Sequence, residues 1–172
     1  MIPKMNYQFK RLATIFIFTL IPMLGYSQLA KHQALYLFNF TRYVEWPAEY
    51  KEGNFVIGVF GSGSEVATEL RDIASKRKVG AQTLEIIEFS TPADIKKCHI
   101  LFVPKGKNGK FDLITSKVLN FNTLIVTEAS SFPPNSAINL VFDGAKLKYD
   151  VNTVNAKAAG LKISDKLIAV SQ

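Results

Sequence analysis

Cysteine and histidine are scarce in this chain of 172 residues. Cys98 is the only cysteine, so no disulfide can form within one chain. His32 and His99 are the only histidines. Because neighbouring side chains on a strand point to opposite faces, Cys98 and His99 cannot easily share one metal ion. We therefore predict no metal site, and we interpret Cys98 as a small buried apolar residue.

The chain also lacks the motifs by which common catalytic sites are recognised. There is no GxSxG, HExxH or Ser-x-x-Lys motif around either histidine. Carboxylates are present, but their spacing pairs no two of them for acid–base catalysis; they include Glu45, Glu49, Asp112 and Asp150. We therefore predict that the protein is not an enzyme and carries no cofactor.

A glycine-rich turn, GVFGSGSE at residues 58–65, has only the first half of a phosphate-binding loop. Gly58 and Gly63 have the required spacing after an apolar run and before a helical pattern. A phosphate loop continues with Lys and then Ser or Thr, which meet the phosphate charge and magnesium. Here Ser64 and Glu65 take those two places. The sequence predicts a tight turn with a helix N-cap, and no nucleotide site.

Acidic residues are fewer than basic ones, and the formal net charge is +7. A moderate positive charge can favour an anionic partner or a membrane surface. The lysines are spread along the chain, however, and no arginine-rich cluster or stacking motif indicates nucleic acid. We interpret the charge as an ordinary solvated surface and expect no nucleic-acid partner.

The N-terminal apolar run, Ala13–Gly25, is too short for a typical membrane-spanning helix, which needs about 20 residues. It contains Pro22 and follows three basic residues, Lys4, Lys10 and Arg11. This layout is typical of a secretory signal peptide, and a retained anchor is the weaker interpretation. We predict a signal peptide at residues 1–27, with cleavage before Gln28. Its removal leaves 18 basic and 14 acidic residues, a formal charge of +4, on a mature domain of residues 28–172 outside the cytoplasm.

Apolar runs of strand type alternate with helical patterns along the mature chain. Strands are predicted at residues 55–61, 83–89, 99–104 and 122–128, and helices at residues 64–76, 91–98 and 111–120, with a polar loop at residues 105–110. Two later strands flank Asp143-Gly144, a favoured hairpin dipeptide, and the last segment is helical with a break or cap at Gly160 and Ser164. We predict a single-domain α/β sandwich with a central, mostly parallel sheet flanked by helices and a C-terminal β-hairpin at one edge.

Five aromatic rings gather in FNFTRYVEWPAEY, residues 38–50. A helix is predicted from residue 29 to residue 44, with Tyr36, Phe40 and Tyr43 on one face that a sheet would cover. Pro47 disfavours helical geometry at the residue before it, so the helix is expected to end close to Glu45.

Trp46 lies where that helix is predicted to end, one turn after Arg42. Two interpretations stay open. The ring could plug the edge of the sheet, or the ring and the guanidinium could hold a small aromatic or carboxylate-bearing ligand by stacking and charge. For the second interpretation the candidate ligand-binding residues are Arg42, Tyr43 and Trp46.

Five short segments follow one another in a recognisable order. They are FTRYVEWP (residues 40–47), VIGVFG (56–61), CHILF (98–102), YDVN (149–152) and AKAAGLKISDKL (156–167). Together they resemble the shared pattern of the YfiR-like family of periplasmic regulatory proteins, over essentially all of the mature chain.

The resemblance implies regulation and not catalysis. Members look like small exported α/β proteins that bind the periplasmic sensor region of an inner-membrane signalling protein, either a diguanylate cyclase or a histidine kinase. The best-understood kind holds a diguanylate cyclase inactive and so restrains cyclic-di-GMP signalling and biofilm formation, and we expect a homodimer here. This chain keeps Cys98 but lacks the other cysteines that form disulfides in that kind, so control through intramolecular disulfides is not expected.

The closing hairpin supplies candidate partner-binding residues. By two-residue periodicity, Tyr149 and Val151 share one face of a strand, and Lys148, Asp150 and Asn152 share the other. If the first two pack inward, the other three are available to a partner. The alternative function is a periplasmic carrier or sensor of small molecules, with Arg42 and Trp46 as anchors.

Overall fold

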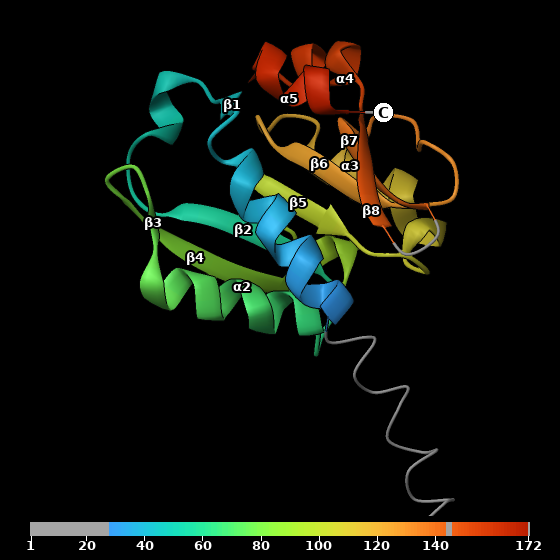
Figure 1. The fold of residues 1–172 in the computed structure, drawn as a ribbon, viewed down its shortest axis with the longest axis horizontal. Coiled ribbons are helices and arrows are strands. Elements are labelled where there is room, and N and C mark those ends of the chain that lie inside the picture. The colour runs from blue at the N-terminus through green and yellow to red at the C-terminus, as the bar shows by residue number, and fades with distance from the viewer. Residues whose placement is uncertain (1–27, 144–145, 172) are drawn as a thin grey trace, which may run out of the picture.

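Strands and helices alternate through the computed structural model, which describes residues 28–143 and 146–171 (Figure 1). The predicted signal peptide and Gly144 of the predicted hairpin turn lie outside the described residues. After an N-terminal helix (residues 28–40), the elements in chain order are β1 (Val44–Glu45), η1 (Ala48–Tyr50), β2 (Phe55–Phe60), α2 (Glu65–Lys76), β3 (Lys78–Val79), β4 (Gln82–Phe89), η2 (Pro92–Asp94), β5 (Ile100–Val103), η3 (Asn108–Lys110), α3 (Phe111–Val118), β6 (Leu124–Glu128), β7 (Ile138–Asp143), β8 (Lys146–Val151), α4 (Thr153–Ala158), β9 (Lys162–Ile163) and α5 (Asp165–Val170).

Seven strands form one sheet in the order β3-β4-β2-β5-β6-β7-β8. The five central strands are parallel, whereas β3 and β8 pair antiparallel with β4 and β7 at the two edges. The predicted α/β architecture, with a mostly parallel sheet and a hairpin edge, is confirmed. The prediction missed β3 and placed a helix at residues 91–98, where only the short η2 forms.

Helices cover both faces of the sheet because strands are added on one side of β2 first and on its other side afterwards. From β2 it steps to β4 through α2, and after β5, on the other side of β2, it steps to β6 through α3. Crossover connections between parallel strands are right-handed. Two such crossovers that run in opposite directions along the sheet therefore place their helices on opposite faces. Accordingly, α2 packs on the face that the N-terminal helix covers, and α3 packs on the other face.

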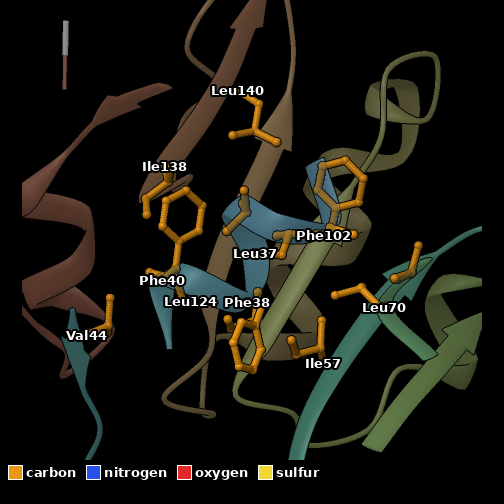
Figure 2. Packing of buried hydrophobic residues seen from close by; sticks show 14 of the residues in the cluster. Leu37, Phe38, Phe40, Val44, Ile57, Leu70, Phe102, Leu124, Ile138 and Leu140 are labelled. Carbon is orange, nitrogen blue, oxygen red and sulfur yellow. The ribbon is translucent and has the colours of Figure 1, made fainter. Parts of the chain in front are cut away.

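The larger core cluster lies under the N-terminal helix. Leu37, Phe38 and Phe40 project from this helix between strand residues such as Ile57 and Ile138 (Figure 2). All five side chains are at most 2% exposed. Burial of a side chain of this size contributes about 1.5–3 kcal/mol, so this helix is a main source of stability.

The N-terminal helix ends earlier than predicted, at residue 40 instead of near Glu45. Residues 41–43 form a turn in which the Thr41 hydroxyl donates a hydrogen bond of 2.7 Å to the Phe38 carbonyl. Val44 and Glu45 then form β1, which pairs antiparallel with β9. The pairing of β1 with a distant segment of the chain ends the helix before Pro47 can.

The C-terminal segment is not one helix with a break but two short helices separated by β9. Gly160 has φ +73°, and the Ser164 hydroxyl caps α5 by accepting from the Lys166 N–H. The predicted break at Gly160 and cap at Ser164 are therefore confirmed, and β9 is an addition. No helix within the described residues has both the length and the apolar character that crossing a membrane requires.

Candidate functional site

Four rings form a cluster at the amino end of β5, and His99 is its centre. The imidazole stacks on Phe55 with the ring centroids 4.0 Å apart, and it meets Tyr50 and Trp46 edge to face at 5.1 Å and 5.8 Å. Trp46 also packs edge to face on Phe55, at 5.1 Å. The Trp46 indole N–H donates to the His99 carbonyl at 3.1 Å. The ring of Trp46 is thus anchored within the protein and is half-buried.

Both nitrogens of His99 have partners. The Val56 N–H donates to Nδ1 at 3.0 Å, so Nε2 carries the proton and donates to the Tyr50 carbonyl at 2.9 Å. Burial lowers the pKa of His99, the hydrogen bond to Tyr50 opposes this effect, and the charge of Lys97 adds to it. His99 is therefore a neutral structural group that joins β2, β5 and η1.

Cys98 packs on the opposite face of the sheet, in the cluster under α3. Its side chain is 1% exposed, and burial raises the pKa of its thiol to about 12. The predictions that Cys98 is a buried apolar residue and that it faces away from His99 are confirmed.

Of the three candidate ligand residues, Arg42 and Tyr43 lie on the turn that follows the N-terminal helix, and Trp46 comes directly after β1. The guanidinium of Arg42 lies over the Phe38 ring, 5.5 Å from its centroid, and within the described residues it makes no hydrogen bond or ring contact with Trp46. Tyr43 is 37% exposed, so the prediction that it belongs to the core is wrong, because the helix ends before it. Phe40 is fully buried as predicted, and the half-buried Tyr36 packs against Tyr149 with the centroids 5.5 Å apart.

The hairpin residues divide between the two faces as predicted. Tyr149 is 5% exposed and Val151 packs against the same core cluster. On the other face, the Lys148 ammonium pairs with Asp143 at 2.7 Å, and the Asn152 side chain caps α4 by accepting from the Asn155 N–H at 3.0 Å. Asp150 is half-buried and has no hydrogen-bond or ion-pair partner among the described residues.

The glycine-rich turn before α2 already holds an anionic group, the carboxylate of Glu88. The Ser64 N–H donates to Glu88 at 2.8 Å, the Gly63 N–H also contributes, and Arg71 pairs with Glu88 at 2.7 Å. Burial raises the pKa of Glu88, but these hydrogen bonds and the Arg71 charge outweigh it and hold the pKa below its usual value. The predicted tight turn with Ser64 as N-cap is confirmed.

Two hollows lie apart from the predicted site residues. One, on the α3 face, is lined mainly by Val118, Leu119, Phe121, Ile125 and Ala158. The other has a volume of about 400 Å³ and lies beyond the carboxyl ends of β2, β4 and β5; it is lined by Phe60, Gly61, Ser90, Gly106, Lys107, Gly109 and Lys110. Neither hollow is lined by Arg42, Tyr43 or Trp46.

A comparison with protein-family models matches residues 30–172 to the family described as YfiR/HmsC-like. The chain belongs to the YfiR/HmsC-like family. The match includes every described element except the first two residues of the N-terminal helix. The family model therefore covers the whole α/β domain that the structure describes, apart from these two residues. No curated protein matches the chain.

Two features of this YfiR/HmsC-like chain were not found by sequence analysis. The structural role of His99 has no local pattern, because its partners come from η1 and β2. The second hollow joins the glycine turn to the loop after β5, which are more than 40 positions apart. A signal for it existed in the predicted β-α-β alternation, since such sheets have a place where the strand order reverses.

Proposed function

We propose that this protein is a periplasmic regulatory binding protein that represses a membrane-bound signalling enzyme by direct contact. The observation that carries the proposal is the match of residues 30–172 to the YfiR/HmsC-like family. The partner is the periplasmic sensor region of an inner-membrane diguanylate cyclase or histidine kinase. In the first case the protein restrains cyclic-di-GMP signalling and biofilm formation.

The surroundings of His99 and Cys98 leave neither side chain free to act in catalysis. Both ring nitrogens of His99 are used in hydrogen bonds to the backbone, and the Cys98 thiol is buried with a pKa of about 12. A general base needs a free nitrogen, and a nucleophilic cysteine needs an accessible thiolate. Neither condition is met at these two residues.

We place the partner contact on the outward face of β8, at Lys148 and Asp150, and at Asn152, which directly follows the strand. β8 is the last strand in the sheet order, so one of its edges pairs with no other strand of the sheet. Because a second copy of β8 can add to this edge, the partner is placed on the outward side chains and not on the edge itself. Lys148 and Asn152 each have a partner within the protein, whereas the Asp150 carboxylate has none among the described residues, so all of its hydrogen-bonding capacity is open to a partner.

The test is capture of the tagged mature protein from crosslinked cell envelopes, followed by mass spectrometry. The proposal expects one membrane signalling protein to be recovered specifically. Asp150→Lys should reduce its recovery, and Glu52→Lys, the same charge change on an exposed loop, should not. Recovery of no membrane protein would count against the regulator, and full recovery with Asp150→Lys would move the contact away from β8.

A homodimer is part of the proposal, and the alternating charges of β8 support it. If two copies of β8 paired antiparallel with Tyr149 at the centre, Lys148 of one copy would lie opposite Asp150 of the other. Opposite charges across a strand pair are favourable, and like charges are not. Sedimentation over a range of concentrations should show a dimer that Asp150→Lys weakens; a monomer at all concentrations would refute it.

The second candidate function is a carrier or sensor for a small aromatic ligand, bound at Arg42, Tyr43 and Trp46. The exposed Tyr43 ring and the exposed Arg42 on neighbouring positions favour it. Because the Trp46 N–H is already bonded, a ligand would stack on the ring face and place a carboxylate on Arg42. Benzoate should then change Trp46 fluorescence saturably, and Arg42→Gln should abolish the change; no saturable change would exclude this site for aromatic carboxylates.

A further inference from the structure

The strand order reverses between β2 and β5. From β2 the chain proceeds to β4 on one side, and the next strand, β5, lies on the other side of β2. The loops that leave the carboxyl ends of these two strands therefore diverge, one toward α2 and the other toward α3, on opposite faces of the sheet. In open α/β sheets such a reversal opens a crevice at the carboxyl edge, and this is where ligands most often bind.

A hollow is present at this position, and we name it the switch-point crevice. Its volume of about 400 Å³ lies within the range typical of small-molecule pockets, roughly 300–1,000 Å³. Phe60 and Gly61 contribute from the end of β2, Ser90 from the end of β4, and the loop after β5 contributes Gly106, Lys107, Gly109 and Lys110. Three separate segments of the chain thus converge on one space.

The loop after β5 folds back over the glycine turn. A Cβ atom built on Gly61 would lie 3.6 Å from Lys107 Cε, so the Lys107 stem passes close to the Gly61 backbone. Gly61 and Gly106 have φ +117° and +83°, a backbone region that glycine adopts at little cost. Glycine is favoured at both positions by this backbone conformation and not by a lack of space, because 3.6 Å is an ordinary contact and nothing lies within 4 Å of the Cβ position at Gly106.

The charge of the switch-point crevice is positive. Lys107 and Lys110 are exposed and line it, and Lys105 lies at the start of the same loop. The carboxylates at the carboxyl ends of β4 and β6 have partners of their own: Glu88 with Arg71 and the Ser64 N–H, and Glu128 with the Lys105 N–H at 3.2 Å. Within the described residues neither Lys107 nor Lys110 forms an ion pair, so both can attract an anion.

We infer that the switch-point crevice binds a small metabolite with an anionic oxygen group, a phosphate or a carboxylate, which lies between Lys107 and Lys110. A phosphate loop carries a lysine after its second glycine, and the glycine turn lacks it. Here two lysines reach the same edge of the sheet from the loop after β5. The anion does not occupy the N-terminus of α2, because Ser64 and Glu88 fill that position. This inference goes beyond the proposed function and stands whichever partner the protein has.

The experiment is an amide NMR titration of the mature protein with inorganic phosphate and, separately, with citrate, at constant ionic strength. Saturable shifts are expected at the amides of Gly61, Gly106, Lys107, Gly109 and Lys110 with at least one of the two probes. The stronger probe identifies whether the natural group is a phosphate or a carboxylate. Its affinity should fall at least tenfold in the double variant Lys107→Ala, Lys110→Ala.

A second pair of exposed lysines gives a matched control. Lys157→Ala with Lys166→Ala removes the same charge from α4 and α5 and should change the affinity less than twofold. If the crevice variant unfolds, Lys107→Gln with Lys110→Gln replaces it, because glutamine keeps the length of the stem. Shifts that do not saturate with either probe, or equal losses in the two double variants, would overturn the inference. Neither result bears on the membrane partner, which the capture experiment tests.

Discussion

At the scale of single residues, His99 has no position for a second ring proton. Nδ1 accepts the Val56 N–H, so a proton on Nδ1 would set two donors against each other and place a charge among three aromatic rings. The loss of one buried hydrogen bond and the desolvation of a cation both disfavour the protonated form of His99. The folded protein therefore resists protonation of His99.

We predict that the unfolding free energy decreases as the pH falls below about 6.5. His99 in the unfolded chain binds a proton with its ordinary pKa of 6.5, whereas its pKa in the folded state is lower. Between these two values the unfolded state binds more protons, so stability falls with falling pH, by at most about 1.4 kcal/mol per pH unit. At pH 7.5, a full unit above 6.5, the histidine is almost entirely neutral in both states and the effect is nearly absent. Urea unfolding at pH 7.5, 6.5 and 5.5 measures it.

The other histidine provides the control for this prediction. His32 is exposed on the N-terminal helix, so His32→Gln should keep the wild-type pH dependence between pH 7.5 and 5.5. His99→Gln should be less stable at pH 7.5 but lose much of the decrease between pH 7.5 and 5.5. An equal decrease in wild type and His99→Gln would assign the pH dependence to other groups.

A second prediction at this scale concerns Gly160, which has φ +73°. An alanine Cβ there would collide with the side-chain amide of Asn122, whose Nδ2 donates to the Ala159 carbonyl at 3.0 Å. Gly53 has nearly the same φ, +72°, but nothing lies near its Cβ position. Gly53→Ala should cost about 1–2 kcal/mol from the backbone alone, and Gly160→Ala about 1 kcal/mol more from the lost hydrogen bond. Equal unfolding free energies for the two variants would contradict the role of Asn122.

At the scale of elements, the sequence patterns predict the long elements better than the short ones. The apolar runs that became β2, β5 and β6 are visible because a strand buried on both faces is almost continuously apolar. β1, β3 and β9 have only two residues each, and no local preference sets such strands. β1 exists because β9 pairs with it from more than 100 positions away, and this pairing also ends the N-terminal helix early.

We predict that the side-chain amide of Asn139, which is buried between β6 and β7, makes a large contribution to the unfolding free energy. Its Oδ1 accepts from Thr127 Oγ1 at 2.8 Å and from the Ala129 N–H at 3.1 Å, and its Nδ2 donates to the Ala129 carbonyl at 3.1 Å. Asn139→Ala leaves these groups without their partner, at a cost of about 2–3 kcal/mol. Asn54→Ala removes one exposed hydrogen bond to Glu85 and should cost about 0.5 kcal/mol or less. Denaturant unfolding of both variants measures the difference, and similar values would show that the buried amide is not critical.

At the scale of the whole molecule, the two candidate sites differ in how far sequence could lead to them. Lys148, Asp150 and Asn152 could be proposed from the sequence because two-residue periodicity is local, and the burial of Tyr149 marks the inward face. The switch-point crevice depends on which strands are neighbours, and the order β4-β2-β5 is a property of the complete sheet. Sequence alternation predicts that a reversal exists but not which strand carries it. Lys107 and Lys110 therefore look like part of an ordinary polar loop until the sheet is assembled.

The two core clusters share one sheet, so we predict that they unfold together. The chain has one tryptophan and one cysteine, and they lie on opposite faces: Trp46 packs against the cluster under the N-terminal helix, and Cys98 belongs to the cluster under α3. In a cooperative domain of this size, loss of either cluster exposes the sheet that both need. Trp46 fluorescence and the rate of Cys98 alkylation should therefore give the same urea midpoint. The alkylation rate at high urea calibrates the fully exposed thiol. A lower midpoint for Cys98 than for Trp46 would show instead that α3 opens locally while the face under the N-terminal helix stays folded.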